Sequence, residues 1–397
     1  MKILTFSTLY PNAERPSHGI FVETRLKQLL SGSQIEARVV APIPWFPSSN
    51  PRFGLYAAFA RVPKREQRSG IEVSHPRYPV LPKFGMSIAP FLLAAWAIPV
   101  VQRMIDEGYD FDLIDAHYFY PDGVAAVMLG RYFKKPVVIT ARGSDISLLS
   151  QFVVPRRLIR WAARHADGLV TVCEALRHAL VKLGASPERV TTLRNGVDTE
   201  LFHPTDRVAQ RKLLGLTSFT LLSVGSLTPV KGHDLTIEAL VQLPDARLII
   251  AGGGQELNNL EMLARRMGVA ERVTFTGILS QAELVRYYGA ADALVLASSR
   301  EGWANVLLES MACGTPVIAT NVWGTPEVVA ASEAGVLMQE RSSSSLVAAV
   351  RQLQNNYPDH RATRRYAESF GWDETTEGQL RLFRAVLQNY QGVVSRA

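Results

Sequence analysis

Short apolar runs rich in valine, isoleucine and leucine alternate along the chain with stretches of helical periodicity. The expected strands are residues 2–7, 36–41, 111–116, 136–141, 168–172, 219–225, 246–251, 272–277, 292–297 and 316–320. The expected helices are residues 20–31, 90–106, 123–133, 155–165, 174–183, 233–242, 256–267, 281–289 and 304–313. Apolar strands separated by helices indicate parallel sheets covered on both faces. The pattern therefore predicts an α/β protein with two doubly wound domains.

A turn signal marks the expected boundary between the domains. The stretch "RNGVDTELFHP", residues 194–204, combines Asn-Gly with a later proline, as turns do. We assign residues 1–198 to the first domain and residues 199–373 to the second. A late helix, residues 374–397, is assigned to the first domain, although composition alone leaves its return across the boundary open.

Composition narrows the class of protein. The chain has 397 residues, 47% of them hydrophobic, and a net charge of +7. Such a length suits two globular domains. The positive charge favours anionic partners such as nucleotides or an acidic membrane surface, and it equally suits a surface tuned for solubility. The two cysteines, Cys173 and Cys313, lie far apart in apolar settings, which fits a reducing compartment and excludes a disulfide framework.

One stretch raises the question of a membrane. The N-terminus does not resemble a signal peptide, because polar residues interrupt its apolar run. Residues 84–102 carry no charge over 19 positions, close to the length of about 20 that a span needs. We expect a packed helix that begins near Pro90 and is bent or interrupted at Pro99. A helix lying on the membrane surface is the alternative.

The stretch "EGWANVLLESMACGTPVIAT", residues 301–320, contains two glutamates that are candidate ligand-binding residues. We expect Glu301 in a loop and Glu309 inside a helix that begins near Ala304 and stops at Gly314. Carboxylates accept hydrogen bonds from paired hydroxyls of a sugar or ribose. The first N–H groups of such a helix, those of Asn305, Val306 and Leu307, hold an anion. The alternative is that Glu301 is solvated and Glu309 is on an exposed face.

Other loops that follow strands carry weaker signals. Lys231 and Gly232 precede a helix, where a lysine meets a phosphate or is merely solvated. The loop "AGGGQE", residues 251–256, allows close backbone approach to a ligand but is equally a plain turn. In the first half, the residues expected near the carboxyl ends of strands are Gly19, His117, Arg142, Ser144 and Asp145. A buried core histidine is the alternative for His117.

Together these motifs resemble the family 4 retaining glycosyltransferases with the GT-B fold. The pair of glutamates before "SMACGTPVIAT" carries the likeness, with Lys231-Gly232 after "SVGSL", "RNGVD" at 194–198 and "HGIFVET" at 18–24. The resemblance implies two Rossmann-like domains whose parallel sheets face a central cleft. The N-terminal region, with "PWFP" and residues 75–86, is similar to enzymes of bacterial exopolysaccharide and teichuronic-acid-type assembly.

The resemblance also implies roles for individual residues. Glu309 would hold the ribose of a nucleoside diphosphate sugar linked to UDP or GDP, and Glu301 the transferred sugar. Lys231 would stabilise the pyrophosphate leaving group. His117 would lie beside the reacting sugar, so His117, Lys231 and Glu301 are the expected catalytic residues. The other expected donor-binding residues are Gly19, Asn195, Ser226, Gly277, Ile278, Asn305, Val306 and Leu307. Ser226 departs from the family, which often has an arginine there that binds phosphate bidentately.

The implied chemistry needs neither a resident cofactor nor a metal, and the sequence has no Asp-x-Asp cluster. No carboxylate stands out as a nucleophile, which suits attack on the face that the leaving group departs from. Arg142 and Asp145 are the expected acceptor residues. Rival interpretations are a sugar-nucleotide epimerase and a non-catalytic nucleotide-sugar-binding partner of a membrane assembly complex. No module for nucleic-acid binding is present in the sequence.

The acceptor is expected to be a glycan or a polyprenyl-pyrophosphate-linked sugar. Residues 52–83 contain seven Lys or Arg and two Glu, interleaved with aromatic residues. Such a stretch beside the apolar residues 84–102 suits an anionic membrane surface. We therefore expect a cytoplasmic protein, peripheral on the inner face of the plasma membrane. A solvated loop with buried aromatic residues is the alternative.

Overall fold

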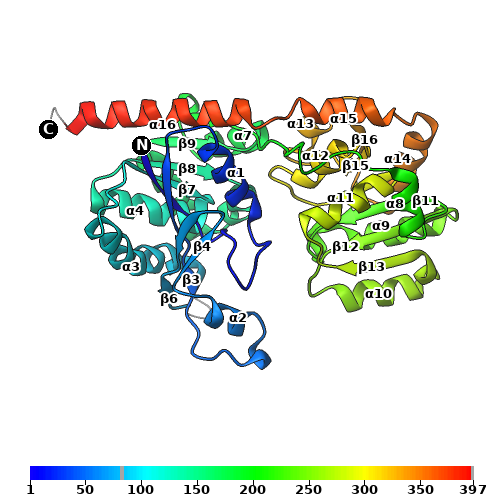
Figure 1. The fold of residues 1–397 in the computed structure, drawn as a ribbon, viewed down its shortest axis with the longest axis horizontal. Helices are drawn as coiled ribbons and strands as arrows, with labels where there is room; N and C mark the ends of the chain where they lie inside the picture. Colours follow the sequence, from blue (N-terminus) through cyan, green and yellow to red (C-terminus); the bar gives the residue numbers. More distant parts are fainter. Residues whose placement is uncertain (81–84, 395–397) are drawn as a thin grey trace. The chain divides into compact units, whose positions relative to one another are not determined.

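The computed structural model describes residues 1–80 and 85–394. The chain forms two compact units (Figure 1). The first unit comprises Met1–Arg194 and the residues from Glu374 onward, and the second comprises Asn195–Asp373. The chain thus passes from the first unit to the second after Arg194, whereas the sequence had predicted the boundary after residue 198.

The first unit has an eight-stranded sheet in the order β10-β9-β8-β7-β1-β2-β5-β4. Its strands are β1 (Lys2–Phe6), β2 (Glu36–Val40), β4 (Arg65–Arg68), β5 (Ile71–Ser74), β7 (Leu113–His117), β8 (Val137–Ala141), β9 (Gly168–Thr171) and β10 (Val190–Thr192). The described helices include α1 (Ile20–Leu30), α3 (Gly85–Asp106), α4 (Val124–Phe133), α6 (Val153–His165), α7 (Glu174–Lys182) and α16 (Asp373–Val394). All strand pairs are parallel except β4 with β5. The sequence had predicted a purely parallel sheet, and the antiparallel β4 shows that this prediction is wrong for the edge of the sheet.

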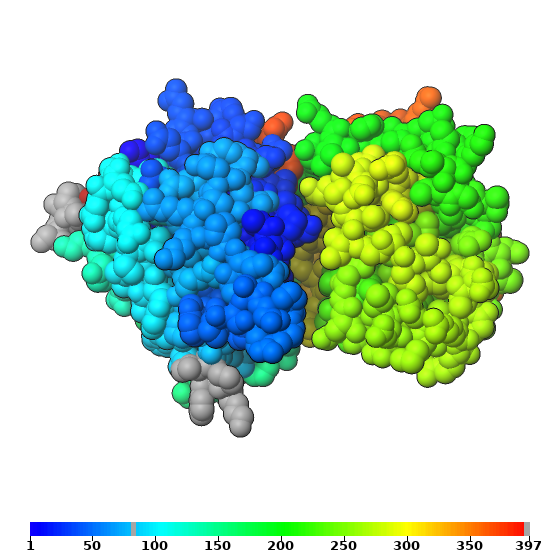
Figure 2. Space-filling model, turned by 60° about the horizontal axis from the view of Figure 1, so that its bottom comes forward, coloured from blue at the N-terminus to red at the C-terminus, as the bar shows by residue number. Residues whose placement is uncertain are grey.

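Two segments outside the large sheet form an extension: residues 41–64 follow β2 and contain β3 (Ile43–Pro44) and α2 (Leu55–Arg61), and residues 75–80 follow β5 and contain β6 (Arg77–Tyr78). β3 pairs with β6 in a separate small sheet. Blue residues of this part of the chain lie together on the face of the first unit in Figure 2. The extension was not predicted, because its two-residue strands are too short to produce a periodic pattern.

The second unit has a six-stranded parallel sheet in the order β13-β12-β11-β14-β15-β16. Its strands are β11 (Phe219–Val224), β12 (Ala246–Ala251), β13 (Val273–Gly277), β14 (Ala293–Leu296), β15 (Val317–Thr320) and β16 (Gly335–Met338). Its helices include α8 (Arg207–Leu213), α9 (His233–Ala239), α10 (Leu257–Arg266), α11 (Gln281–Ala290), α12 (Asn305–Ala312), α13 (Thr325–Val328), α14 (Ser343–Asn355) and α15 (His360–Glu368). The apolar strand residues, among them Leu221, Leu248 and Ile318, form its buried core.

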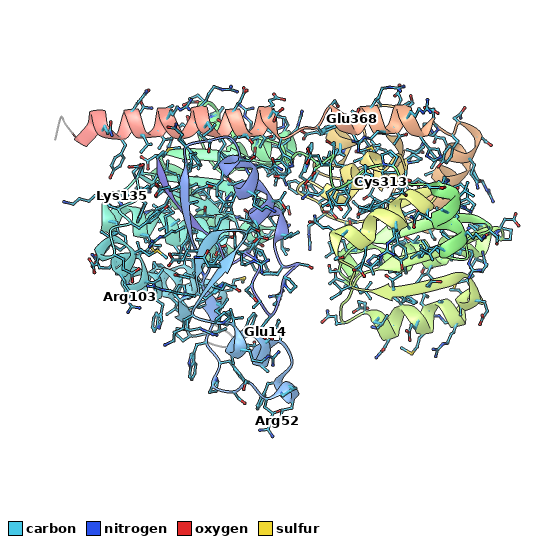
Figure 3. The ribbon with its side chains drawn as sticks, viewed as in Figure 1. Glu14, Arg52, Arg103, Lys135, Cys313 and Glu368 are labelled. Atoms are coloured by element: carbon cyan, nitrogen blue, oxygen red, sulfur yellow. The ribbon has the colours of Figure 1, made fainter. Side chains whose placement is uncertain are left out.

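All the predicted strands and helices are present, most with ends shifted by one or two residues. The exception is α3, which begins at Gly85 and continues through Pro90 and Pro99. Its predicted start near Pro90 is wrong, and the helix is not interrupted at Pro99, whereas a bend there stays a prediction. Residues 81–84, which belong to the stretches 52–83 and 84–102 discussed above, lie outside the described residues. Cys173 and Cys313 are buried thiols, and Cys313 follows α12 (Figure 3).

α3 is the one described helix that is long and apolar enough to cross a membrane. Its most apolar window has a mean hydropathy of 1.6, and 33% of that window is buried within the chain. Core helices of water-soluble proteins meet the same criteria, so this helix alone decides nothing about a membrane.

Candidate active site

The two loops of the second unit that carry Lys231 and Glu301 lie where its strand order reverses. From β11 the chain builds outward through β12 and β13 on one side, then returns to place β14, β15 and β16 on the other. Ligands of open α/β sheets bind beyond the carboxyl ends of strands at such a switch point. The loop after β11, residues 225–232, and the loop after β14, residues 297–304, flank this point.

Lys231 and Glu301 join these two loops. The Lys231 Nζ donates to Glu301 Oε1 at 2.6 Å. The two side chains are 24% and 11% exposed, so the pair is partly shielded from water. The sequence placed each of these residues in a loop that follows a strand, and the structure brings their charged groups together. The free chain thus holds a cation and a carboxylate ready at the switch point.

Hydrogen bonds from backbone and side chains hold the two loops in place. The Ser299 N–H donates to the Val230 carbonyl at 2.8 Å. The Arg341 guanidinium donates to the carbonyls of Ala297 (2.9 Å) and Pro229 (3.1 Å), which belong to different loops. The buried His233 ring contacts the Ser223 hydroxyl at 2.9 Å. Arg341 and His233 were missed by sequence reasoning, since nothing in their local pattern indicates a long-range loop contact.

Glycines allow the loops to pass close to one another. Gly232 has φ +70°, and a Cβ there would lie 2.2 Å from the Ala297 carbonyl oxygen. A Cβ on Gly252 would lie 1.8 Å from the Gly225 oxygen, and one on Gly254 would lie 2.4 Å from the Leu227 oxygen. Packing between the loops therefore accounts for Gly252 and Gly254.

We expect Gly232→Ala to lower the free energy of unfolding by about 2 kcal/mol or more, because it adds a backbone clash to an unfavourable φ. Urea unfolding at fixed pH measures this. Gly215→Ala is the matched control, because Gly215 has φ +66° but its Cβ would meet nothing within 4 Å. Equal losses in the two variants would show that the close approach to Ala297 is unimportant.

Two asparagines meet at the N-terminus of α12. Asn305 is its first residue, and its side-chain Oδ1 accepts from Asn195 Nδ2 at 3.2 Å. Gly314, just beyond the helix, has φ +85°, as expected of a left-handed cap. The N–H of Leu307 already donates to the Ala304 carbonyl at 3.1 Å. The expectation that Leu307 offers this N–H to a ligand is therefore corrected, and Asn305 and Val306 remain the candidates.

Glu309 lies within α12 and is 9% exposed. Its Oε2 accepts from the buried Tyr288 hydroxyl at 2.8 Å. Burial raises the pKa of Glu309 to about 7, and the hydrogen bond from Tyr288 only partly offsets this. Glu309 therefore titrates near neutral pH. Tyr288 was not predicted, because a tyrosine within a helix gives no signal of a partner on the next helix.

The other predicted donor residues border the same edge of the sheet. Gly277 ends β13 with φ +75°, and its carbonyl accepts from Gly252 N at 2.8 Å. Ile278, the next residue, is 74% exposed, which is unusual for isoleucine and suits a surface that a base would cover. Ser226 is exposed in the loop after β11.

In the first unit, His117 ends β7 and its ring is buried. Arg142 Nη2 donates to His117 Nδ1 at 2.6 Å. Since arginine only donates, the His117 proton is on Nε2, which lies 3.1 Å from Asp115 Oδ2. Burial and the nearby Arg142 charge lower the pKa of His117 to about 4, so the ring is neutral at pH 7. With both nitrogens engaged, the ring is not available as a proton acceptor in this conformation, and its expected place beside the reacting sugar stays a prediction.

The C-terminal helix takes part in this buried network. Gln379 of α16 donates to Asp115 Oδ2 at 3.2 Å and accepts from Arg25 Nε at 2.8 Å. Arg25 in turn donates to the Leu193 carbonyl at 3.1 Å. The late helix is thus attached to the first unit by polar contacts that composition could not reveal.

Asp145 has a structural role. It is fully buried, and its carboxylate accepts the backbone N–H groups of Phe119 (2.6 Å) and Gly143 (2.7 Å). Its oxygens also accept the N–H of Arg142. This carboxylate ties the loops after β7 and β8 together, so the expectation that Asp145 binds an acceptor is wrong. Arg142 is also buried, which leaves it little surface for an acceptor.

Gly19 caps α1 with φ +63°, and a Cβ there would lie 2.1 Å from the Leu9 carbonyl oxygen. The glycine is thus required by the fold of the loop after β1. Within residues 1–80 and 85–394, the structure contains no group of three His, Cys, Asp or Glu side chains that could hold a metal ion.

Comparisons with known proteins show which family the chain is similar to. Residues 205–370 match the family "Glycosyl transferases group 1", and residues 55–201 match "Glycosyltransferase Family 4". A D-inositol 3-phosphate glycosyltransferase of Mycobacterium marinum is 30% identical over 324 residues, 76% of this chain and 69% of the relative. Its namesake in Mycobacterium sp. strain KMS is 34% identical over 249 residues, 59% of this chain and 56% of the relative.

Solved structures share the fold over nearly the full chain. Sucrose-phosphate synthase from Thermosynechococcus elongatus has a TM-score of 0.80 at 18% identity and covers 98% of this chain and 99% of its own. HepE of Anabaena, solved in complex with UDP-glucose, has a TM-score of 0.71 at 21% identity and covers 100% of both chains. The sequence relatives above are named for inositol phosphate, not for exopolysaccharide or teichuronic-acid assembly.

Proposed function

This chain belongs to the glycosyltransferases of group 1 and family 4, with the GT-B fold, and from that premise we propose that it is a retaining enzyme of cell-surface glycan assembly. It uses a nucleotide sugar and transfers the sugar to a hydroxyl of a glycan or of a lipid-linked acceptor. The observation that carries the proposal is the Lys231–Glu301 pair at the switch point of the second unit.

In the proposed complex the donor lies along the carboxyl edge of the second sheet. Glu309 accepts hydrogen bonds from the ribose hydroxyls, and the exposed Ile278 lies against the base. The N–H groups of Asn305 and Val306, at the start of α12, face negative charge on the donor. Ser226 does not supply the bidentate phosphate contact of an arginine, so Lys231 has the larger share of the phosphate charge.

The pair at the switch point changes partners when the donor binds. A pyrophosphate carries more negative charge than one carboxylate and competes with Glu301 for Lys231. Glu301 is then released to accept hydrogen bonds from the sugar hydroxyls. As the glycosidic bond breaks, charge develops on the leaving diphosphate, and the positioned Lys231 ammonium stabilises it. A leaving-group oxygen takes the proton of the attacking hydroxyl, because the buried His117 ring has both nitrogens engaged.

The names of the sequence relatives support a second acceptor class. They are D-inositol 3-phosphate glycosyltransferases, so a phosphorylated polyol is an alternative to a lipid-linked glycan. An epimerase and a non-catalytic binding partner remain rival functions, and each is excluded by sugar transfer to an added acceptor. We further propose that the enzyme is cytoplasmic and peripheral on the membrane, supported by the exposed aromatic and basic residues of the extension.

Donor binding tests the proposed function first. We expect one class among UDP, GDP and ADP sugars to raise the melting temperature, and Glu309→Ala to abolish that shift. Lys212→Ala, an exposed substitution on α8, is the control and should retain it. If no nucleotide sugar stabilises the protein in the presence of either acceptor class, a donor site at this edge is wrong.

A further inference from the structure

A pocket in the first unit lies outside the site described above. Its volume is about 530 Å³. The pocket is built by the extension, the start of β4, the end of β5 and one face of α3. Its lining residues are Trp45, Phe46, Ala60, Lys64, Arg65, Ser74, His75, Pro76, Arg77, Trp96, Val100 and Arg103. We propose that this pocket binds the phosphate or pyrophosphate group of a lipid-linked acceptor, an inference that rests on the proposed function and locates its acceptor.

The pocket lies at the edge of the first sheet where ligands are expected. Ser74 is the last residue of β5, a strand parallel to β2. Arg65, at the start of the antiparallel β4, is paired with Ser74 in the ladder. The pocket is therefore at the carboxyl end of β5, the end from which ligand-binding loops emerge in α/β sheets.

Its charge is of one sign. Four of the lining side chains are Lys or Arg, and no Asp or Glu is among them. The Arg77 guanidinium is held by the carbonyls of Phe59 and Val62, and Arg65 forms a 2.9 Å salt bridge with Glu107. Within the described chain, the side chains of Lys64 and Arg103 form no hydrogen bond or salt bridge. Lys64 and Arg103 thus remain able to bind an anion, beside two cations that are fixed in place, although Glu107 also attracts the Arg103 charge.

A buried hydroxyl gives independent support for a ligand. The Ser74 side chain lines the pocket and is 1% exposed, yet its Oγ has no hydrogen-bond partner among the described residues. Buried hydroxyls in folded proteins are nearly always paired. A phosphate oxygen in the pocket would accept this hydrogen bond.

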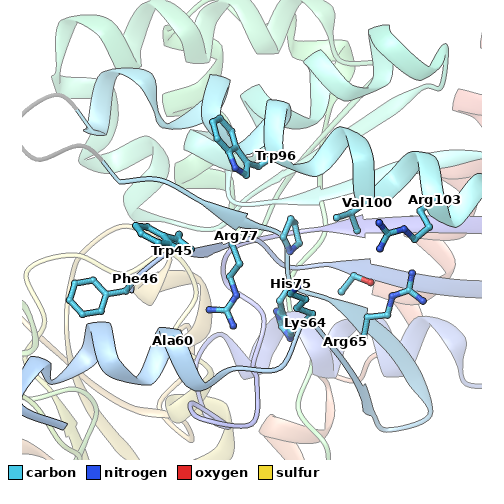
Figure 4. A pocket seen from close by; sticks show the side chains of 12 residues that line it. Trp45, Phe46, Ala60, Lys64, Arg65, His75, Arg77, Trp96, Val100 and Arg103 are labelled. Atoms are coloured by element: carbon cyan, nitrogen blue, oxygen red, sulfur yellow. The ribbon is translucent and has the colours of Figure 1, made fainter. Parts of the chain in front are cut away.

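The opposite side of the pocket suits an apolar chain. Figure 4 shows Trp45, Phe46 and Trp96 on one side, Lys64, Arg65 and Arg103 on the other, and Arg77 between them. Trp45 is 57% exposed and Trp96 44%. Large exposed aromatic residues beside cations fit a ligand that joins an anionic head to a hydrocarbon chain, and free phosphate would leave them unused.

The extension also connects the pocket to the loop that carries Gly19. Arg61 of α2 forms a 2.6 Å salt bridge with Glu14, which precedes α1. The Arg15 guanidinium lies 5.8 Å from the centre of the Phe59 ring. An acceptor head bound in the pocket would thus lie beside the loop after β1, on the edge of the sheet that also presents the end of β7.

The test is calorimetric binding of farnesyl pyrophosphate to the full chain. We expect Lys64→Ala with Arg103→Ala to weaken binding at least tenfold, because both unpaired cations are lost. The matched control, Lys212→Ala with Arg361→Ala, removes one Lys and one Arg from exposed positions of the second unit and should leave the Kd unchanged. Equal weakening in both pairs, or no weakening in the first, overturns the proposal.

Ser74→Ala is a second variant, chosen because it should weaken binding without destabilising the fold. Because its Oγ has no protein partner to lose, the urea midpoint should stay unchanged while binding weakens severalfold. Inorganic pyrophosphate and vesicles of phosphatidylglycerol distinguish the source of the phosphate. The assignment to a lipid-linked acceptor is overturned if inorganic pyrophosphate binds as tightly as farnesyl pyrophosphate. It is also overturned if the protein binds the vesicles but not farnesyl pyrophosphate.

One further variant distinguishes the donor site from the pocket experimentally. Glu309→Gln is expected to weaken donor binding and keep farnesyl pyrophosphate binding. Failure of the proposed function would appear as absent donor binding and transfer with the pocket intact. Failure of the present inference would leave transfer unaffected by the Lys64 and Arg103 substitutions.

Discussion

Replacing Lys231 with alanine is expected to lower kcat by about 10²–10³-fold, the usual effect of removing one group that stabilises developing charge. Lys231 is the cation at the switch point of the second sheet, and its Nζ is fixed 2.6 Å from Glu301. The donor Kd should change less than kcat, because the charge on the leaving diphosphate grows in the transition state. Steady-state transfer from the donor identified above, with a saturating acceptor, measures both effects.

The substitution also leaves Glu301 without its partner, and a control must separate the two effects. The double variant Lys231→Ala with Glu301→Gln removes both charges and should restore the free energy of unfolding without restoring kcat. Lys231→Arg keeps the charge but changes its geometry and should recover part of the rate. A Lys231→Ala enzyme with kcat near that of the wild type would contradict the role given to this pair.

The alternation of apolar strands and helices predicted most of the fold, because most strands of the two large sheets are buried and the helices between them cover the sheets. The pattern could not reveal β3 and β6, which have two residues each, or the antiparallel β4. It also missed that α3 continues through Pro90 and Pro99. Pro90 is buried within α3, and the local sequence around a proline does not show whether the helix continues through it.

The candidate site could be predicted where chemistry is local to a loop. Glu301, Lys231 and the start of α12 were found from their positions after strands. His117 and Asp145 also follow strands, yet their side chains are buried and engaged by Arg142, Asp115 and backbone N–H groups. Whether a polar side chain points to a ligand or into its own domain depends on neighbours far away in the sequence. Tyr288 shows the same limit, since only the packing of α11 against α12 makes it a partner of Glu309.

Glu309→Gln is expected to stabilise the free protein at pH 8 relative to the wild type. The folded chain raises the pKa of Glu309 from 4.5 to about 7, chiefly through burial. The unfolded chain therefore releases this proton at lower pH than the folded chain does. Between these values the unfolded state binds fewer protons, so Glu309 makes stability fall as pH rises through the window, by about 3 kcal/mol in total. Glutamine does not titrate and removes this loss.

Urea unfolding at pH 4.5, 6 and 8 tests the effect as a difference between variant and wild type, so that other titrating groups cancel. Tyr288→Phe is the informative second variant. It removes the hydrogen bond to the carboxylate and should move the window to higher pH. A difference between Glu309→Gln and wild type that is independent of pH would show that Glu309 titrates normally.

The same carboxylate should make donor binding depend on pH in the opposite direction. Ribose hydroxyls donate to the ionised form, so the affinity of the wild type for its donor should rise between pH 6 and pH 8. Glu309→Gln should bind about tenfold more weakly at pH 8, as expected for loss of a charged acceptor, and show no such rise. Because binding favours the ionised form, the wild type should also release protons near pH 6.5, measurable by calorimetry in buffers of different ionisation enthalpy. Proton uptake instead would mean that the donor meets a protonated Glu309, and the carboxylate would then not be the ribose acceptor.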